Sequence, residues 1–558
     1  MKRIALSTVV ALTIAACSGG DENASPNGNE GPDGGATPID DAGTSPGSDA
    51  PTGPYYFDAD GDGVLDEKDN CPKTVNTSQI DLNVNGIGDA CDPDLLLVRE
   101  EVTLKHPGVE TGGKRWFLAS HANFGTELWR TDGTAAGTAV IDSTVGPPAI
   151  TTGIVRDMVV AGGKIFTVFQ ENGGTNKLWA IDPESSLLTP LGTVTYWPGF
   201  LSLNGKAYFN AQLGTNASAG VEIAVSDGTV GGTFIVEDMR PGTASFIARL
   251  LNATSTQFYF TESDYDANAG YYYWNGLYKS NGSAPATKIS SLTDVRHLGQ
   301  TDQNVYFASF VNYNGGGKSS AQIYRTSAAE NSLTQVSSFT GTNRSIGLSS
   351  VRAGNAIYFR ADDPDITSPL YDPNQQCIHT IADGDAAIAK ALCVTNPSSV
   401  VPNVLSLYAL SATKFLYYVD NSIGGTYLGD LHVYDTTEKT STPLKQCHAP
   451  APRFVSFAGG YLFDCQKDAE VWFTDGTEVG TTKLFSDPAA KSVAIDTVAL
   501  ARAFFRVTQK DGTYAIWETE GTIAQTKKLF GPTAGGHTLM SVGEHLLISD
   551  SKGSLWLH

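Results

Sequence analysis

One short pattern recurs along most of this 558-residue chain, and it constrains the fold more than any other feature of the sequence. The clearest copies read ELWRTDGTAAGT from Glu127, EIAVSDGTVGGT from Glu222 and EVWFTDGTEVGT from Glu470. Weaker copies fill the intervals, and the central position is aliphatic in all ten: Leu128, Leu178, Ile223, Leu277, Ile323, Ile378, Leu431, Val471, Ile516 and Leu555. Consecutive copies are about 47 residues apart, so the pattern predicts an array of similar structural units.

Each unit is predicted to contain four short strands. A segment rich in aromatic residues precedes each copy, as in GGKRWF ending at Phe117 and NGKAYF ending at Phe209. The Asp-Gly-Thr of the full copies predicts a tight turn, because Asp and Gly tolerate the positive φ angles that hairpin turns need. A third element such as TFIVED and a fourth such as SFIARLL from Ser245 complete the unit. Four strands in about 47 residues is the size of one β-propeller blade.

We therefore predict an all-β fold, a β-propeller of about ten four-stranded units over residues 95–558. The spacing allows one wide ring or two smaller ones. The last unit ends at His558, two strands into its hairpin. The segment LLLVREEVT, from Leu95 to Thr103, can supply the missing outer strand and close the ring, which removes exposed strand edges.

The repeat resembles that of the ELWxxDGT repeat proteins, which are secreted or surface proteins of bacteria. The resemblance covers residues 95–558, closely in the three full copies and loosely elsewhere. It implies a propeller-like β architecture, and the biochemical role of the family is poorly defined.

The N-terminus predicts export. Residues 1–16 combine a basic start with an apolar run too short to span a bilayer, which is typical of a signal peptide. The run ends Ile-Ala-Ala-Cys17, which resembles the lipobox of bacterial lipoproteins and implies cleavage before a lipidated Cys17. An ordinary signal peptide with an incidental cysteine is the alternative. Ser18 after the cysteine implies an outer membrane lipoprotein, which we expect to be exposed at the cell surface.

Residues 17–54 are predicted to form a disordered acidic linker between the lipid and the folded part. They consist largely of Gly, Pro, Ser and Asp and contain neither Lys nor Arg. Such a segment buries too little apolar surface to offset the entropy lost on ordering.

Residues 55–94 form the most specific motif, in which Asp and Asn alternate around Gly in two halves, DADGDGVLDEKDNCP and DLNVNGIGDACD. This spacing directs several oxygens toward one point, and Ca²⁺ takes six to eight oxygen ligands. The predicted ligands are Asp58, Asp60, Asp62, Val64, Asp66 and Asp69 in the first half, and Asp81, Asn83, Asn85, Ile87, Asp89 and Asp92 in the second. Val64 and Ile87 would contribute backbone carbonyls, and an Asp/Gly-rich loop without metal is the alternative.

This segment resembles a thrombospondin type 3 repeat. The matching residues are Asp-Asn-Cys-Pro ending at Pro72, then Asn76 and Gln79, then Asp-Ala-Cys-Asp ending at Asp92. The resemblance implies structural Ca²⁺ and a Cys71–Cys91 disulfide. The family often has Asp where Asn83 and Asn85 stand, which implies a weaker second site.

Apart from Cys17, six cysteines remain, an even number that suits an oxidising compartment. Sequence proximity suggests Cys377–Cys393 and Cys447–Cys465 as further disulfides, each joining neighbouring strands of a less regular unit.

Two other sets of residues can be interpreted either as structural or as functional. The Trp that recurs once per unit is predicted to pack between units, and Asp132, Asp227 and Asp475 are predicted to form turns. A carbohydrate-binding surface or a ring of metal sites is the alternative for these residues. The stretch DYDANAG from Asp264 alternates like a calcium loop, and a polar loop is the alternative.

We expect a binding protein, with no catalytic residue. The net charge of −22 disfavours nucleic acid and anionic lipid, so the membrane contact is predicted to be the lipid anchor alone. Outside the linker the sequence has no GxSxG, HExxH or phosphate-binding loop. The first hypothesis is a calcium-binding, lipid-anchored adhesion protein whose partner is an extracellular glycan, a matrix component or a cell-surface protein. The alternatives are an extracellular polysaccharide hydrolase or lyase on a propeller scaffold, and a structural envelope protein.

Overall fold

The fold is known from a computed structural model that describes most of the chain after residue 56. The described residues are 57–77, 79, 86–88, 91, 96–99, 101–121, 125–141, 157–170, 176–194, 199–213, 220–266, 271–282, 285–311, 320–339, 346–361, 375–395, 403–422, 427–449, 452–499, 501–543, 545–550 and 553–558. The chain divides into two compact units, Met1–Tyr55 and Tyr56–His558, and every described residue belongs to the second. The predicted signal peptide, Cys17 and the acidic linker therefore lie outside the described residues.

The described residues form 40 strands in ten four-stranded sheets, with one 3-10 turn, η1 (Ile523–Gln525). Blade 1 comprises β2 (Val102–Thr111), β3 (Lys114–His121), β4 (Gly125–Thr131) and β5 (Ala139–Val140), and blade 2 comprises β6 (Met158–Ala161), β7 (Lys164–Gln170), β8 (Asn176–Ile181) and β9 (Leu188–Thr193). Blade 3 comprises β10 (Leu201–Leu203), β11 (Lys206–Ala211), β12 (Glu222–Ser226) and β13 (Phe234–Glu237), and blade 4 comprises β14 (Ile247–Ala253), β15 (Phe258–Asp266), β16 (Tyr271–Ser280) and β17 (Thr287–Thr293). Blade 5 comprises β18 (Val295–Gln300), β19 (Asn304–Val311), β20 (Ser320–Ser327) and β21 (Thr334–Gln335). Blade 6 comprises β22 (Ile346–Ala353), β23 (Ala356–Ala361), β24 (Gln375–Ala382) and β25 (Ala389–Thr395), and blade 7 comprises β26 (Asn403–Ala409), β27 (Lys414–Asp420), β28 (Leu428–Asp435) and β29 (Thr440–His448). Blade 8 comprises β30 (Phe454–Phe457), β31 (Gly460–Cys465), β32 (Glu470–Thr474) and β33 (Thr482–Ser486), and blade 9 comprises β34 (Ser492–Ala499), β35 (Arg502–Thr508), β36 (Tyr514–Thr519) and β37 (Thr526–Thr533). Blade 10 comprises β38 (Thr538–Val542), β39 (His545–Ser549), β40 (Leu555–Leu557) and β1 (Leu96–Arg99).

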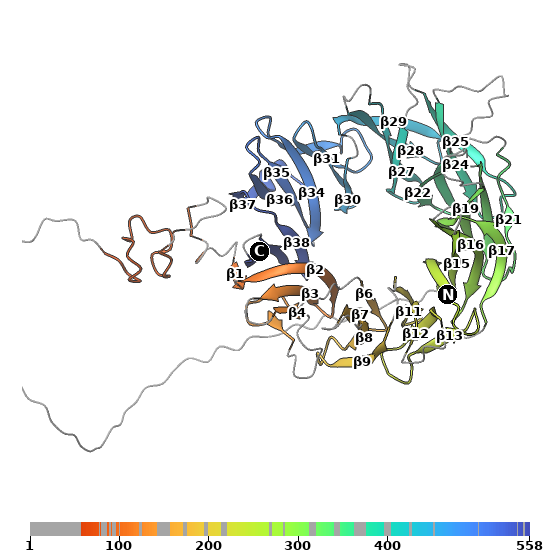
Figure 1. Ribbon diagram of the computed structural model, residues 1–558. Coiled ribbons are helices and arrows are strands. Elements are labelled where there is room, and N and C mark those ends of the chain that lie inside the picture. The colour runs from red at the N-terminus through yellow and green to blue at the C-terminus, as the bar shows by residue number, and fades with distance from the viewer. Residues whose placement is uncertain are drawn as a thin grey trace, which may run out of the picture. The chain divides into compact units, whose positions relative to one another are not determined.

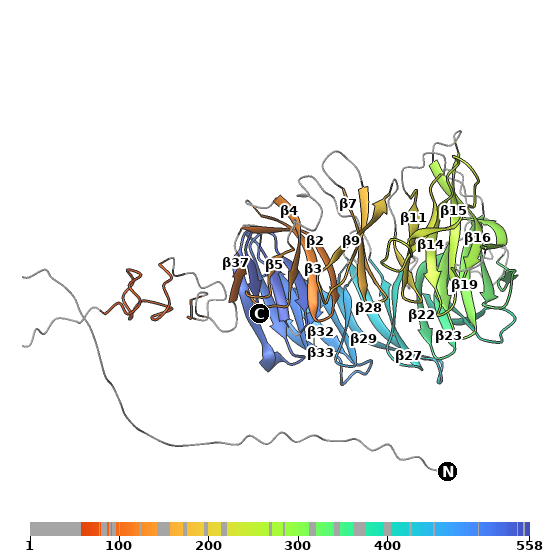
Figure 2. The same ribbon diagram turned by 90° about the horizontal axis from the view of Figure 1, so that it is seen from below.

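The ten sheets form one β-propeller ring, which decides between the single and the double ring that the spacing allowed. In blades 1 to 9 the four strands follow one another in chain order and pair in sequence. The first strand of a blade contacts the first strand of the next, as β14 does with β18 and β34 with β38. Figure 1 shows the blades following one another around the ring, and Figure 2 shows the same blades from below. Among the described residues, none forms a helix long and apolar enough to cross a membrane.

The ring closes through a strand from its N-terminal side. β1 pairs antiparallel with β40, with Leu96 opposite Leu557 and Leu97 opposite Trp556, and completes blade 10. β2 then begins blade 1 and contacts β38. The predicted closure is confirmed, although the segment is shared: Val102 and Thr103 already belong to β2.

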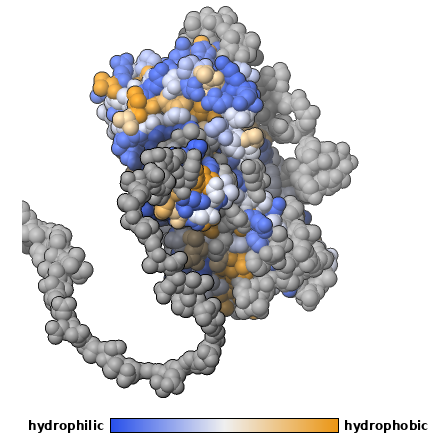
Figure 3. Space-filling view, turned by 90° about the vertical axis from the view of Figure 1, so that its left-hand side faces the viewer, coloured by the Kyte–Doolittle hydropathy of each residue, from blue (hydrophilic) through white to orange (hydrophobic). Residues whose placement is uncertain are grey.

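The repeat places its apolar residues between blades. All ten central aliphatic residues lie in the third strand of their blades and are at most 3% exposed. The second strands supply a ring of buried phenylalanines, which includes Phe117, Phe166, Phe209, Phe307, Phe359, Phe463 and Phe505. Burying one such side chain stabilises the fold by about 1.5–3 kcal/mol, so this repeated packing dominates the stability of the ring. On the outside, Figure 3 shows hydrophilic side chains with smaller hydrophobic patches between them.

The recurring tryptophan packs against the preceding blade, as predicted. Trp129 of blade 1 lies in an apolar cluster with Met540 and Leu547 of blade 10, and its indole N–H donates to the carbonyl of Ala119 at 3.2 Å. Trp129, Trp179 and Trp556 are buried, whereas Trp472 and Trp517 are half-buried. The tryptophans are therefore inter-blade packing residues first.

The Asp-Gly-Thr turns are built as predicted. Asp132 Oδ1 accepts hydrogen bonds from the amide (2.9 Å) and the hydroxyl (2.7 Å) of Thr134, and Gly133 has a φ of 91°. The turns at Asp227 and Asp475 repeat this geometry. A Cβ on Gly137 would stand 1.9 Å from Asp132 Oδ1, which explains the second glycine of the DGTxxGT pattern.

Two expectations about irregular units need correction. Cys377 and Cys393 lie opposite each other on β24 and β25 and form a disulfide within blade 6. The disulfide between Cys447 on β29 and Cys465 on β31 instead joins blade 7 to blade 8. Asp264 and Asp266 belong to β15, with Asp266 opposite Tyr271, so the first part of the stretch that alternates like a calcium loop is strand. The rest of that stretch lies outside the described residues.

Candidate calcium site and blade junctions

The loop from Asp58 to Asp69 is shaped by hydrogen bonds from backbone amides to carboxylates. Gly61 and Gly63 have φ angles of 76° and 91°, and their amides donate to the two oxygens of Asp58 at 2.8 and 3.0 Å. The amide of Val64 donates to Asp62 Oδ1 at 2.8 Å. The Asp-x-Asp-Gly-Asp-Gly spacing therefore folds the chain tightly around its own acidic side chains.

Three predicted ligands converge in this loop. Asp58, Asp60 and Asp62 each offer one carboxylate oxygen, and these atoms lie within 4.8 Å of one another. Asp60 Oδ2 is buried and has no hydrogen-bond partner among the described residues. Burial raises the pKa of Asp60, and the neighbouring carboxylates of Asp62, Asp69 and Asp58 raise it further. A divalent cation would satisfy the orphaned oxygen and relieve the repulsion, so these residues fit Ca²⁺.

The other first-half ligands close the loop from outside this cluster of three. Asp66 Oδ1 accepts the amide of Ala59 at 2.8 Å, while the amide of Asp66 donates to the Phe57 carbonyl at 2.9 Å. Asp69 Oδ1 accepts the amide of Cys71 and the side-chain amide of Gln79, both at 2.8 Å. Val64 lies in the same loop and is half-buried.

Asn76 and Gln79 have roles that sequence matching alone did not assign. The amide of Asn76 donates to Asp62 Oδ2 at 2.8 Å, which holds the calcium loop against the following turn. The side chain of Gln79 donates to Asn76 Oδ1 at 2.9 Å as well as to Asp69. Together these two side chains orient the outer oxygens of the acidic residues, as residues behind the ligands of metal sites commonly do.

A disulfide joins the two halves of the motif. Cys71 and Cys91 are bonded, with a Cα–Cα distance of 5.7 Å, and Cys71 is 1% exposed. Gly88 donates its amide to the carbonyl of Asn70 at 2.8 Å, and a Cβ there would stand 2.2 Å from Asn70 Oδ1. Of the second-half ligands only Ile87 is described, and it is exposed. Asp81, Asn83, Asn85, Asp89 and Asp92 lie outside the described residues.

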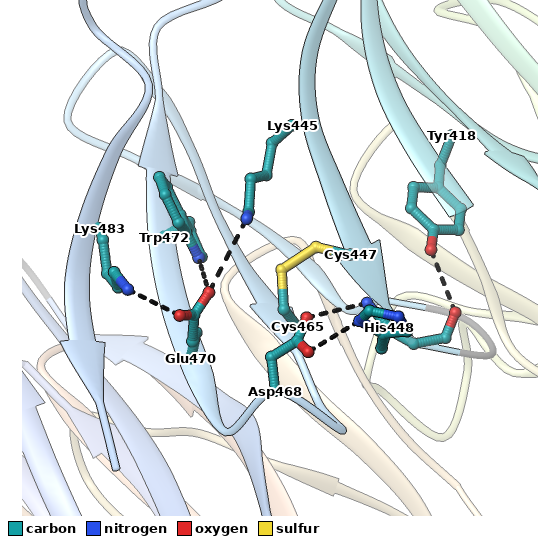
Figure 4. A network of polar contacts seen from close by, with 10 residues as sticks. Tyr418, Lys445, Cys447, His448, Cys465, Asp468, Glu470, Trp472 and Lys483 are labelled. Carbon is teal, nitrogen blue, oxygen red and sulfur yellow. Dashed lines mark hydrogen bonds and ion pairs between the residues drawn. A yellow bond between two sulfur atoms is a disulfide. The ribbon is translucent and has the colours of Figure 1, made fainter. Parts of the chain in front are cut away.

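A second acidic group lies at the junction of blades 7 and 8 but does not suit a metal. Cys465, Asp468 and Glu470 bring ligand atoms within 4.8 Å of one another. The sulfur of Cys465 is bonded to Cys447, so it offers no thiolate, and Asp468 is occupied by His448. Asp468 accepts the amide of His448 at 3.0 Å and faces its Nδ1 at 2.8 Å (Figure 4).

Glu470 is occupied in a similar way. It faces Lys483 at 2.7 Å and Lys445 at 3.9 Å, and it accepts the indole N–H of Trp472 at 2.8 Å (Figure 4). The ammonium group of Lys445 also lies 4.4 Å from the centre of the Trp472 ring. This arrangement ties β29 of blade 7 to β32 of blade 8, so we assign it to structure.

Several of the described histidines pack against aromatic rings, and four of them illustrate this packing. His297 lies against Phe307, His379 against Phe359, His432 against Tyr417 and His537 against Phe530, with centroid distances of 4.8–6.1 Å. Burial lowers the pKa values of His297, His432 and His537, so the neutral imidazole is favoured. We therefore assign these four histidines to packing.

Two buried glutamates were missed by sequence reasoning. Glu127 and Glu222, the first residues of two full repeat copies, are 4% and 1% exposed, and burial raises the pKa of each to about 7. Glu222 Oε2 accepts the amide of Met239 at 3.0 Å, so this side chain holds the loop that leads to blade 4. The signal in the sequence was the recurrence of Glu at the start of the copy.

A comparison with known families matches the first part of the described chain. The family model of the thrombospondin type 3 repeat matches residues 57–79. No curated protein matches the chain. The described chain is thus a β-propeller protein that carries a thrombospondin type 3 repeat.

Solved structures resemble the chain only distantly. A structure from an analysis of two prolyl endopeptidases is 14% identical over 65% of this chain and 55% of its own, with a TM-score of 0.35. The β-propeller domain of the Trilobed protease from Pyrococcus furiosus is 10% identical over 62% of this chain and 98% of its own, with a TM-score of 0.30. The chain spans about half the length of the first three of these structures.

Proposed function

We propose that this protein is a calcium-stabilised binding or adhesion protein of the cell surface, held in the outer membrane by a lipid on Cys17. The propeller would be its recognition module, and the partner would be an extracellular glycan, a matrix component or a cell-surface protein. The observation that carries the proposal is the convergence of the Asp58, Asp60 and Asp62 carboxylates, with a buried Asp60 oxygen that lacks a partner.

Asp58, Asp60 and Asp62 would hold the calcium, and the ion would neutralise their mutual repulsion. Each of these carboxylates also accepts a hydrogen bond from a backbone amide, which restricts the direction of its oxygens before metal arrives. The role of the ion is therefore to order the segment that precedes the propeller.

Recognition by the propeller is supported by the way its blades use their residues. The repeated apolar and aromatic side chains are buried between blades, so the connecting loops are free to vary and to contact a partner. The seven cysteines and the lipobox-like segment around Cys17 support an oxidising, membrane-anchored setting.

The test is a glycan and matrix-protein array probed with the full chain carrying Cys17→Ser, with calcium and with chelator. We expect retention on at least one ligand in calcium, at least tenfold weaker retention in chelator, and no released product. Asp60→Asn should reproduce the chelator effect in the presence of calcium, because it removes a charge from the cluster. Val75→Ala, an exposed position within the same module, is the matched control and should bind like the parent.

Product release from a bound glycan would replace the binding function with the hydrolase or lyase alternative. If the parent is retained equally in calcium and in chelator, and Asp60→Asn is retained like the parent, then binding does not depend on the metal. The lipid anchor is tested separately: Cys17→Ser should move the protein from the membrane fraction to the soluble fraction, and an unchanged distribution contradicts the anchor.

A further inference from the structure

Two arginines meet at the junction of blades 4 and 5, and neither belongs to the repeat pattern. Arg249 lies on β14 and Arg296 on β18, which are the first strands of their blades and contact each other. Both side chains are half-buried. Their positive charges lie close enough that Arg296 contributes to lowering the pKa of Arg249, after the larger effect of burial.

Asp294 organises this junction. It is the single residue between β17 and β18 and has a φ of 43°. Its amide donates to the carbonyl of Trp274 at 2.7 Å, and its carbonyl accepts the amide of Phe310 at 3.4 Å. Its carboxylate binds Arg296 through two hydrogen bonds, at 3.2 Å from Nε and 3.0 Å from Nη2. One residue thus fixes Arg296 and the backbone of both neighbouring aromatic residues.

Each guanidinium lies over one of those aromatic rings. The Cζ of Arg249 is 5.4 Å from the centre of the Trp274 ring, and that of Arg296 is 4.9 Å from the centre of the Phe310 ring. Stacking of this kind holds the plane of a guanidinium and leaves its N–H edge available to an oxyanion.

Arg249, Arg296 and Asp294 together carry one net positive charge. Both oxygens of Asp294 face Arg296, and no carboxylate oxygen of the described residues lies within 4.0 Å of Arg249. Arg249 is therefore a half-buried cation that lies over an aromatic ring, is repelled by Arg296 and is attracted by Asp294 without an ion pair between them. In a chain whose net charge is −22, such a local excess of fixed positive charge favours an anionic group at this point.

We propose that Arg249 and Arg296 form a subsite for an oxyanion, a carboxylate or a sulfate, carried by an acidic polysaccharide. The inference rests on the proposed glycan-binding function and specifies the chemistry of its ligand. The N–H fork of Arg249 binds the oxyanion, Arg296 adds charge from the side, and the exposed part of Trp274 contacts the sugar ring. Bidentate pairing of a guanidinium with a carboxylate or sulfate gives both affinity and orientation.

The test measures binding of three oligosaccharides to the full chain carrying Cys17→Ser, in calcium, by calorimetry. The probes are an oligogalacturonate, a chondroitin sulfate oligosaccharide and a neutral cello-oligosaccharide. We expect an acidic probe to bind, and Arg249→Gln to weaken it by about tenfold or more, because a charge-assisted hydrogen bond is lost. Arg249→Lys should recover only part of the affinity, since it restores the charge without the fork.

Arg352→Gln is the matched control. Arg352 lies on β22, the first strand of the next blade, and its charge already pairs with Asp302 at 2.7 Å in an exposed position. We expect this variant to bind acidic probes like the parent. The melting temperatures of the Arg249 variants, compared with the parent, establish that they fold.

The carboxylate and sulfate probes distinguish the two sources of the oxyanion. Equal affinity of the parent and of folded Arg249→Gln for an acidic probe overturns the inference. So does binding of the neutral probe alone, which leaves the proposed glycan-binding function standing. If no glycan and no matrix protein is retained in calcium, the proposed function fails together with this subsite.

Discussion

The calcium module and the propeller are stabilised by different kinds of interaction. Among the described residues of the module, Asp62, Asp69, Cys71, Asn76 and Gly88 are buried, and three of these have polar side chains. In the ring the buried residues are mostly aliphatic and aromatic and recur from blade to blade. A short segment cannot build an apolar core, so it depends on amide-to-carboxylate bonds, a disulfide and, as we propose, a metal. The long array gains its stability from repetition.

The largest effect that separates the two regions is expected from Phe463→Ala. Phe463 is fully buried at the junction of blades 7 and 8, and its loss should destabilise the ring by about 3–5 kcal/mol. Chemical denaturation in calcium measures this change, and Phe463→Leu is the control with a much smaller expected loss. The affinity of the module for calcium should not change. A weaker calcium affinity in this variant would show that the two regions are coupled.

The converse change is the removal of the Cys71–Cys91 disulfide. Replacing both residues with Ser should cost the module about 3 kcal/mol, because the open chain has more conformations to lose when calcium binds. Calorimetry should then report calcium affinity weaker by about a hundredfold. Cys377→Ser with Cys393→Ser is the matched control and should lower the stability of the ring alone. Equal calcium affinity with and without Cys71–Cys91 contradicts the comparison.

A pH effect is expected in the ring, from Glu222. Its pKa of about 7 in the folded protein exceeds the ordinary value of 4.5, because it is buried. The folded state therefore holds a proton that the unfolded state releases between these values. This contribution to stability is complete below pH 4.5 and is lost as the pH rises through 7, by about 3 kcal/mol.

Glu222→Gln tests this assignment by denaturation at pH 5 and pH 8. The variant should lose less stability than the parent between the two values, since its amide does not titrate. Glu127, whose pKa is also about 7, should contribute a similar slope that remains in the variant. If the stability of variant and parent changes equally between pH 5 and pH 8, Glu222 is not the source of the pH dependence.

The smallest effect is expected from Asp132→Ala. It removes two hydrogen bonds to Thr134 in an exposed turn, which should cost about 1 kcal/mol. Denaturation of this variant is compared with that of Ala136→Ser, an exposed change in the same turn that should have no effect. Calcium affinity should stay constant, in contrast to Asp60→Asn. A weaker calcium affinity in Asp132→Ala would support the alternative that the ring contains metal sites.

Features that repeat or lie close together in sequence could be predicted from the sequence. The aliphatic and aromatic positions marked the third and second strands of the blades, because burial between blades requires such residues at fixed spacing. The Asp-Gly-Thr turns and the converging Asp58, Asp60 and Asp62 are local, and their geometry follows from short stretches of chain. The closing strand was predictable because the last unit lacked one strand.

Features that depend on how blades sit against one another could not be predicted. Whether ten units form one ring depends on the angle between neighbours, which no single copy encodes. The Cys447–Cys465 bridge crosses between blades although its residues are close in sequence. Arg249 and Arg296 are neighbours only because the first strands of adjacent blades meet. Glu222 was missed because its burial depends on the loop that covers it.

The pairing of β1 with β40 also sets a temporal order. Among the described residues β1 is the earliest strand and its partner β40 is the latest, so the two can pair only after every other strand of the ring has been synthesised. Until β38, β39 and β40 exist, blade 1 has no neighbour on one side and the growing array is an open arc. The seam between blades 10 and 1 is therefore the one junction at which segments from the two ends of the ring sequence are joined within a single sheet.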